Sequence, residues 1–493
     1  DRKPRRHRCG AACRDAASGA GRRGVGGAGR DRGHRCRDPD RRAAEADPPD
    51  RRAQIVMEAH RLDIAGLHAA YVAGETTPVA VAEHYLARIK RHDPALRSYV
   101  EVDHAGALAA ARESDRRFAS GDARALEGVP IAVKANIAVS GLEWNAGMAL
   151  RRGIIATDDA EAVRRLRAAG AIILGTLNMH EAALGATTDN PWFGRAINPH
   201  RDGYTPGGSS GGSGAAVAAG LCAAALGTDT LGSVRIPAAY NGVYGIKPTR
   251  GAIPDTGLVA LSEWLDSIGP IARSPDDLAM LLSVLSDVAE AAPAPDRLVV
   301  LANFDDIACE AEVLAAYRRA LDLMSDMPGT TLALEDGAAD IRFAGFVVAA
   351  RELIGHLGNA RTEAAEQLSG ELRFMLDYAD GLAAEEVARA DAIIARTRAA
   401  VRGALADRSV LLMPAAPQAA FAHSARPPVT QAAFTAFANI AGLPAISIPA
   451  GVNENGLPVA VQLVGAENCD AALIALARRL DAGLAGHVPS PLM

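Results

Sequence analysis

The stretch "GVPIAVKANIAV" (residues 128–139) is a short apolar run with β-branched residues, and a glycine and a proline mark its start. Such a run predicts a buried strand. The stretch "DDAEAVRRLRAAG" (158–170) follows and predicts a helix with acidic residues at its start and Gly170 at its end. The next run, "AIILGTLN" (171–178), predicts a second buried strand. Strands that alternate with helices in this way indicate an α/β fold with a largely buried sheet.

The same alternation continues on both sides of this unit. Helical spacing of apolar residues predicts helices between residues 60 and 94, with a break at "GETTP", and over residues 101–121. The stretch "SPDDLAMLLSVLSDV" (274–288) predicts a helix with a serine N-cap. The remaining expected elements are a mainly helical segment over 310–405 and strands within 296–304, 409–417 and 444–465.

The composition excludes several classes of protein. The chain has 493 residues and a formal net charge of −6, which argues against a general nucleic-acid or anionic-membrane partner. No apolar run reaches the roughly 18–20 residues that cross a bilayer. We expect the short, alanine-rich run 215–226 to form a packed helix. Six scattered cysteines without a CxxC pair argue against a zinc site and favour a reducing compartment, so we expect a cytoplasmic protein.

Residues 1–56 differ from the rest of the chain, because they hold 16 Lys and Arg against 8 Asp and Glu and show no hydrophobic period. A transit peptide and a nucleic-acid-binding arm are two interpretations, although the acidic residues argue against the first. We favour a third, a disordered or non-native basic extension ahead of Met57, where an amphipathic pattern begins. Residues 57–493 are then expected to form a single domain.

Lysine is rare in this chain, which has only Lys3, Lys90, Lys134 and Lys247 beside 48 arginines. A desolvated lysine can lose its proton near neutral pH and act as a base, whereas arginine cannot. Lys134 ends the apolar run "VPIAVK", where burial would have that effect. On the residues alone two alternatives stay open. Lys134 can snorkel to solvent, and Lys247, in "YGIKPT", competes as a base unless it serves a salt bridge or a surface turn.

The stretch "GGSSGGSGAAVAAGLCAAALGTDTLGSVR" (207–235) has a Gly-rich cluster at each end. A flexible linker would stay polar, and a P-loop would need a lysine after the glycines, so neither fits well. Two overlapping G-x-S-x-G matches centre on Ser209 and Ser210 and are compatible with an α/β-hydrolase-type esterase. The downstream histidines available to such an enzyme are His356, His423 and His487.

A different interpretation uses both clusters. A serine–lysine relay can activate a serine nucleophile without histidine, and the second cluster would place backbone N–H groups of an oxyanion hole ahead of Ser233. A Gly-rich binding module without catalytic activity is the remaining alternative.

Several motifs together resemble the amidase signature family. The stretches "GGSSGGSGAAVAAG" and "LGTDTLGSVRIPAAYNGVYGIKPT" resemble its central signature. Five further stretches resemble other family motifs: "GVPIAVKANI", "GTLNMHEAALG", "NPHRDGYTPGGSSGG", "LDSIGPIARS" and "NIAGLPAISIPAGVNENGLPVAVQLVG". The likeness runs from about residue 60 to the end of the sequence. It implies a three-layer α/β fold in which helices cover both faces of a mixed central sheet.

The resemblance also implies a Ser-cisSer-Lys site. Lys134 would be the base, Ser209 the bridging serine held in a cis peptide, and Ser233 the nucleophile that accepts the acyl group. The oxyanion hole would use the backbone N–H groups of Thr230, Leu231 and Gly232, and the supporting residues would be Ser210, Asp229 and Arg235.

Three positions depart from the family pattern. Leu231 stands where the family usually has glycine, so it would be strained if that position needs a positive φ, or else project into the substrate pocket. Ala135 replaces the usual aspartate after the lysine. The stretch "EWNAGM" (143–148) sets Trp144 close to where substrates are expected.

We therefore predict an amide-bond hydrolase that acts on a small carboxamide or a ureido or carbamoyl substrate through an acyl-enzyme. The alternatives are an amidotransferase A-type subunit that transfers glutamine-derived ammonia, and the esterase described above. We expect no cofactor and no metal. The expected partner is a small-molecule amide rather than nucleic acid or membrane, with a homodimer as the assembly considered.

Overall fold

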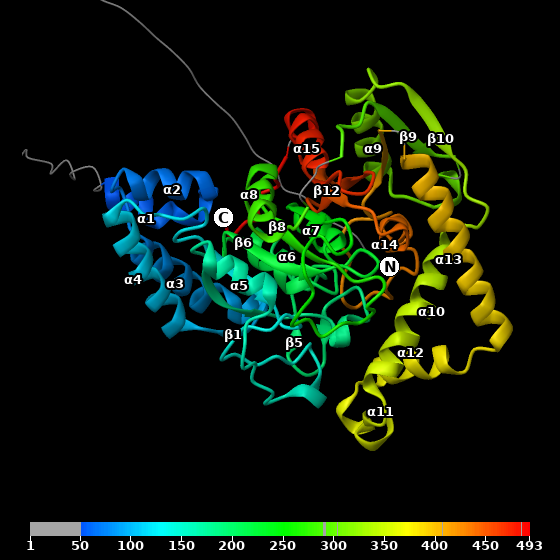
Figure 1. Cartoon of the computed structure of the whole chain (residues 1–493), viewed down its shortest axis with the longest axis horizontal. Helices are drawn as coiled ribbons and strands as arrows, with labels where there is room; N and C mark the ends of the chain where they lie inside the picture. Colours follow the sequence, from blue (N-terminus) through cyan, green and yellow to red (C-terminus); the bar gives the residue numbers. More distant parts are fainter. Residues whose placement is uncertain (1–50, 289–291, 303, 407, 485) are drawn as a thin grey trace, which may run out of the picture. The chain divides into compact units, whose positions relative to one another are not determined.

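The apolar run that ends in Lys134 forms strand β2 (Pro130–Lys134), and each of its residues is buried. A computed structural model describes residues 51–493 except 289–291, 303, 407 and 485 (Figure 1). The expected extension lies outside the described residues as far as residue 50. Helix α1 (Arg51–Glu58) begins six residues before the expected boundary at Met57, and it packs against the 3-10 helix η1 (Ala59–Arg61) and α3 (Pro78–Leu96).

The described residues form an eleven-stranded sheet with β2 near one end. The strands lie in the order β1 (Tyr99–Val102), β3 (Ile172–Leu177), β2, β6 (Ala224–Thr228), β8 (Ile268–Ala272), β7 (Tyr244–Lys247), β12 (Ala445–Val452), β13 (Pro458–Val464), β11 (Ser409–Pro414), β9 (Arg297–Leu301) and β10 (Gly329–Leu332). Strand β2 is parallel to β3 and β6, and β9 is parallel to β10 and β11, whereas the other pairs are antiparallel. The mixed sheet is therefore confirmed. A separate two-stranded ladder joins β4 (Asp189–Asn190) and β5 (Gly194–Arg195).

Helices lie on both faces of this sheet, as two neighbouring residues of β7 show. The Tyr244 hydroxyl donates a hydrogen bond to Asp481 of α15 (Asp470–Leu484), whereas a Cβ on Gly245 would lie 2.8 Å from Ala238 of α7 (Arg235–Asn241). Successive residues of a strand point to opposite faces, so α15 and α7 cover opposite faces and the three-layer prediction is confirmed. The other α-helices are α2 (Ile64–Val72), α4 (His104–Ser120), α5 (Glu161–Ala168), α6 (Gly211–Ala218), α8 (Pro275–Leu285), α9 (Ala311–Leu323), α10 (Ala338–Leu357), α11 (Ala360–Glu363), α12 (Gly370–Asp380), α13 (Ala384–Leu405) and α14 (Ala436–Ala441).

Local signals placed several element ends correctly. Helix α4 ends at Gly121, which takes the left-handed conformation with φ 77°. Helix α8 begins after Ser274, whose hydroxyl accepts a hydrogen bond from the Asp277 N–H at 3.0 Å. The segment 310–405 is mainly helical as expected, but it also contains the edge strand β10. Within it, α10 packs against α12 and α13 (Figure 1).

The prediction of one packed helix over residues 215–226 is wrong. Helix α6 ends at Ala218, Gly220 takes the left-handed conformation with φ 62°, and the chain then enters strand β6. Alanine favours a helix, but β6 pairs with β2 on one side and β8 on the other, and this pairing overrides the local propensity.

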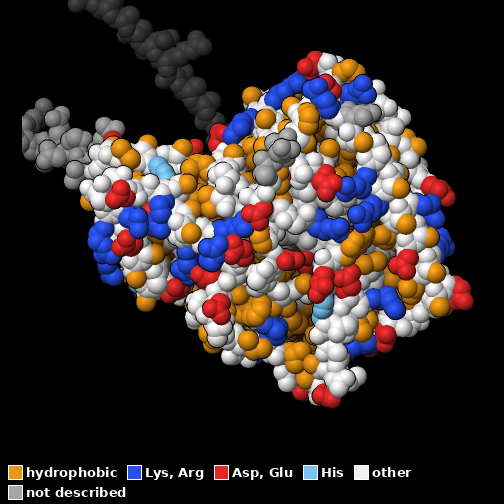
Figure 2. Space-filling model, viewed as in Figure 1, with side chains coloured by type: hydrophobic (Ala, Val, Ile, Leu, Met, Phe, Trp, Pro, Cys, Tyr) orange, Lys and Arg blue, Asp and Glu red, His pale blue; other side chains and the backbone are white. Residues whose placement is uncertain are grey.

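The outer surface carries charges of both signs. Figure 2 shows Lys and Arg side chains interspersed with Asp and Glu over the face in view. Within the described part of the chain, each helix is too short or too polar to span the apolar core of a membrane.

Candidate active site

Two neighbouring strands bring the first functional side chains together. Strands β2 and β6 run parallel, with Val133 beside Leu226, so their C-terminal residues Lys134 and Thr228 reach the same edge of the sheet. The Lys134 Nζ donates hydrogen bonds to Thr228 Oγ1 and to Ser209 Oγ, both at 2.7 Å. The first contact was not predicted, although the position of Thr228 at the end of the strand beside β2 is a signal for it.

Lys134 does not snorkel to solvent, because its side chain is completely buried. Burial lowers the pKa of this amine from 10.5 to about 7, and the carboxylates of Asp266 and Asp229 limit the fall. A large share of Lys134 is therefore neutral near pH 7, with a lone pair able to accept a proton from Ser209.

The first Gly-rich cluster holds its serines in a buried backbone. The peptide bond between Gly208 and Ser209 is cis, as the resemblance implied. The Ser210 hydroxyl donates to the Thr228 carbonyl at 3.1 Å and accepts from the Thr228 N–H at 3.2 Å. The Ser210 N–H donates to the carbonyl of Ser233 at 3.2 Å, so the two Gly-rich clusters are joined directly.

Ser233 differs from these serines because it is only partly buried and lines a cavity. Within the described residues its hydroxyl forms no hydrogen bond. The structure therefore presents a serine hydroxyl to a cavity next to a buried Ser–Lys pair.

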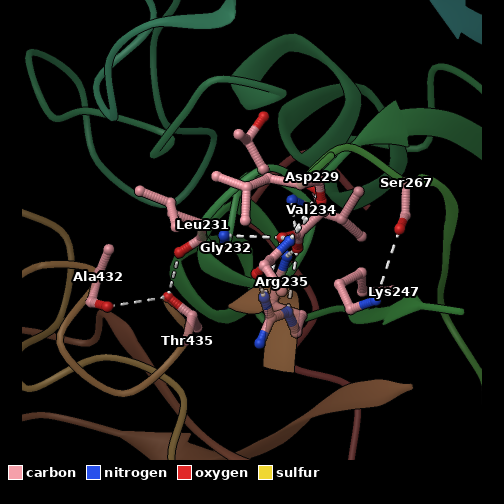
Figure 3. Close-up of polar contacts among 12 residues, drawn as sticks. Asp229, Leu231, Gly232, Val234, Arg235, Lys247, Ser267, Ala432 and Thr435 are labelled. Carbon is pink, nitrogen blue, oxygen red and sulfur yellow. Dashed lines mark hydrogen bonds and ion pairs between the residues drawn. The ribbon is translucent and has the colours of Figure 1, made fainter. Parts of the chain in front are cut away.

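The loop that precedes Ser233, residues 229–232, offers backbone N–H donors and is called the donor loop. The Thr230 and Leu231 N–H groups have no protein partner among the described residues, whereas the Gly232 N–H already donates to Asp229 Oδ1 at 2.7 Å (Figure 3). Of the three N–H groups expected in the oxyanion hole, that of Gly232 is thus already hydrogen-bonded to the Asp229 carboxylate.

Leu231 is not strained, because the positive φ of this loop falls on Gly232, at 130°. A Cβ on Gly232 would lie 2.3 Å from the Thr435 hydroxyl oxygen, so only glycine fits there. That hydroxyl donates to the Leu231 carbonyl at 2.6 Å (Figure 3), and the Leu231 side chain lines the cavity.

A buried ion pair between Arg235 and Asp229 holds the donor loop in place. Arg235 Nη2 lies 2.9 Å from Asp229 Oδ1, and both side chains are fully buried (Figure 3). Burial alone would raise the pKa of Asp229, but Arg235 and Lys247 outweigh it and hold this pKa well below its usual range. The remaining Arg235 donors reach Gln462 Oε1 at 2.9 Å and Asn439 Oδ1 at 2.6 Å. The pair therefore stays ionised and fully hydrogen-bonded.

A second carboxylate, Asp266, was missed on the sequence although it lies in the "LDSIGPIARS" motif. It accepts a hydrogen bond from the Thr230 hydroxyl at 2.5 Å and from the Leu261 N–H at 2.9 Å. Burial raises its pKa to about 6, and these hydrogen bonds oppose the rise. Asp266 thus contacts the donor loop through the Thr230 hydroxyl, and its negative charge raises the pKa of Lys134.

Lys247, the competing base, is also buried, so it does not lie in a surface turn. Its Nζ donates to the Pro248 carbonyl at 2.7 Å and contacts Ser267 Oγ at 3.5 Å (Figure 3). Among the described residues it has no hydrogen bond to a serine of the Gly-rich clusters, and this favours Lys134 as the base.

The expectation that Trp144 lies near the substrate stays a prediction. Trp144 is not among the described residues that line the cavity, because its indole Nε1 donates to the Asn136 carbonyl at 3.0 Å and Arg151 covers its ring at 4.8 Å. Ala135 is completely buried beside Lys134, which leaves no acidic side chain at that position.

The cavity beside Ser233 has a volume of about 320 Å³ and a mainly apolar lining. Its walls come from the loops at 183–186 and 427–432, from the donor loop, and from helices α10 and α12. Its lining includes the side chains of Leu231, Leu261, Arg342, Phe346, Met375 and Gln431.

The described structure does not support the esterase arrangement. His356, His423 and His487 form no hydrogen bond with Ser209, Ser210 or Ser233 in the described part of the chain. The His423 ring nitrogen Nε2 instead lies 2.8 Å from the Ala196 carbonyl.

Comparisons with known proteins agree with this geometry. The sequence model of a family described as Amidase matches residues 80–474. The A-type subunit of glutamyl-tRNA(Gln) amidotransferase from Desulforapulum autotrophicum is 32% identical, over 83% of this chain and 94% of its own. A crystal structure described as an amidase has a TM-score of 0.79 and 30% identity, and covers 86% of this chain and 100% of its own. The corresponding amidotransferase chain from Thermotoga maritima has a TM-score of 0.70 and 26% identity, and covers 90% and 99%.

Proposed function

The chain belongs to the amidase signature family, and we propose that it cleaves the carbon–nitrogen bond of a small carboxamide through an acyl ester on Ser233. The observation that carries this proposal is the buried 2.7 Å contact between Lys134 Nζ and Ser209 Oγ, next to a serine hydroxyl that faces a cavity. A lysine whose pKa lies near 7 can act as the base at neutral pH.

In the proposed mechanism protons first pass from Ser233 to Ser209 and from Ser209 to Lys134, and they later return along the same path. Neutral Lys134 takes the proton of Ser209 as Ser209 takes that of Ser233, and Ser233 Oγ forms a bond with the amide carbon. The proton then returns through Ser209 to the leaving nitrogen, the C–N bond breaks and ammonia departs. Water, activated by the same relay, hydrolyses the ester and restores Ser233.

The carbonyl oxygen becomes negative in this step and needs donors. The unpartnered N–H groups of Thr230 and Leu231 support a role as the oxyanion hole, whereas Gly232 would first have to share its N–H with Asp229. Asp229, Arg235 and Ser210 would act by positioning the loops.

The curated relatives favour one form of this chemistry, in which glutamine is the amide and its ammonia passes to a partner protein. The support is the likeness to proteins named as the A-type subunit of the glutamyl-tRNA(Gln) amidotransferase, both in sequence and in structure. On this proposal the chain works with other subunits rather than as a homodimer, and in the cytoplasm.

A stand-alone hydrolase of another small carboxamide or a ureido compound is the second candidate. Two observations support it. The TM-score is 0.79 for the amidase but 0.70 for the amidotransferase chain, and Leu231 occupies space in the cavity where the family usually has glycine.

The two parts of this proposal need separate tests. A fluorophosphonate should label Ser233 and should fail to label Ser233→Ala, whereas an adduct on Ser209 or Ser210 would refute the nucleophile assignment. Ammonia release should then be measured with glutamine and with a panel of aliphatic, aryl and ureido amides. Preference for glutamine supports the amidotransferase form, and preference for another amide supports the stand-alone hydrolase.

A further inference from the structure

Arg342 brings a charge into an otherwise uncharged cavity. It lies on α10 together with Phe346 and Ala349, four and seven residues further on, so these three side chains share one face of the helix. Among the described residues that line the cavity, Arg342 alone carries a charged side chain.

Among the residues that the structure describes, this arginine has no hydrogen-bond or ion-pair partner. Its Nε is buried and makes no hydrogen bond, and no ion pair joins its guanidinium to an acid among the described residues. Other arginines of the neighbouring helices are paired, such as Arg361 with Asp377 at 2.7 Å and Arg396 with Asp336 at 2.8 Å. Burial lowers the pKa of Arg342, but arginine remains charged in proteins.

An arginine that snorkels to water would keep its donors hydrated. The buried Nε of Arg342 is instead left without a partner, and an unpartnered buried donor is destabilising unless a ligand supplies an acceptor. The group that best satisfies a guanidinium is a carboxylate, which accepts two parallel hydrogen bonds from it.

We infer that Arg342 binds a carboxylate of the substrate, so that the enzyme acts on amides whose other end carries a free carboxylate. This inference rests on the proposed function, because it assumes that the amide end of the same molecule meets Ser233. It makes Arg342 a specificity-determining residue at the wall of the cavity.

The test compares glutaramate with pentanamide, which has a methyl group in place of the carboxylate. For the wild type, kcat/KM for glutaramate should exceed that for pentanamide by roughly ten- to a hundredfold. In Arg342→Gln this ratio should fall to about one, and Arg342→Lys should lie between, since it keeps the charge and loses the planar fork. Arg351→Gln, an exposed position on the same helix, should keep the wild-type ratio. An equal ratio in wild type and Arg342→Gln would overturn the inference.

A binding experiment separates this inference from the proposed chemistry. Calorimetry with Ser233→Ala should detect glutaramate, and adding Arg342→Gln should weaken its binding by a similar factor. Equal affinity of the two variants would refute the role of Arg342. If fluorophosphonate fails to label Ser233 and no amide is cleaved, yet binding depends on Arg342, the proposed reaction fails and the carboxylate site stands.

Discussion

Leu231 packs directly against Gly345: a Cβ on Gly345 would come within 2.8 Å of Leu231 Cδ2. The loop that offers the oxyanion donors and the helix that carries Arg342 therefore meet at a residue without a side chain. A larger residue at either position would push one of these elements away from the other.

We predict that Gly345→Ala lowers activity without unfolding the protein. Alanine in a helix interior should add about 0.5–1 kcal/mol of stability relative to glycine, but here it displaces Leu231 and the adjoining donors. A misplacement of this kind should reduce kcat/KM by about ten- to a hundredfold. Gly355→Ala is the matched control on the same helix, because among the described residues no atom other than those of its chain neighbours and its own helix backbone lies within 4 Å of its Cβ position. Full activity in Gly345→Ala would contradict the proposed contact between loop and helix.

A second prediction concerns the pH dependence of kcat/KM. In the proposed mechanism the base is the neutral amine of Lys134, whose pKa is lowered to about 7 by burial. Activity should therefore fall as the pH drops through about 7, by about tenfold per pH unit, and level off above it. Lys134→Arg should be inactive at any pH because its guanidinium stays protonated, and exposed Lys90→Ala should keep the wild-type profile. An acid limb near pH 4 would exclude Lys134 as the titrating base.

Asp266→Asn should move this acid limb to lower pH. The negative charge of Asp266 raises the pKa of Lys134, so removing it should lower that pKa by up to about one unit. The amide oxygen can still accept from the Thr230 hydroxyl, whereas the NH2 group replaces the oxygen that accepts from the Leu261 N–H. Exposed Asp255→Asn should leave the limb unchanged. An acid limb that stays unchanged or moves to higher pH in Asp266→Asn would contradict this effect of its charge on Lys134.

The sequence singled out the side chains of the candidate site but not the residues that surround them. Lys134, Ser209 and Ser233 stand in motifs whose order along the chain is distinctive, so a resemblance was enough to single them out. Thr228 reaches Lys134 through the pairing of β2 with β6, and Asp266 accepts a hydrogen bond from Thr230, 36 residues earlier in the chain. Such contacts between distant segments leave no periodic signal.

The error over residues 215–226 has a clear physical origin. Residues 224–228 look helical by composition, yet their two neighbouring strands decide their conformation. Arg342 lies in a segment without a motif. The proposal for it rests on its place in the cavity wall and on its buried Nε without a hydrogen-bond partner, and the sequence shows neither.

The last prediction concerns the buried pair below the loop. Arg235→Met should cost about 3–5 kcal/mol of unfolding free energy, because it leaves the Asp229 carboxylate charged and buried without its counter-ion. Arg396→Met, which removes a more exposed ion pair with Asp336, should cost about 0–1 kcal/mol. Urea denaturation of both variants measures the difference. Adding Asp229→Asn to Arg235→Met should recover part of the loss, since it removes the unpaired charge, although the neutral amide oxygen would hold the Gly232 N–H less firmly than the carboxylate does. A loss below about 1 kcal/mol in Arg235→Met would mean that the loop does not depend on this pair.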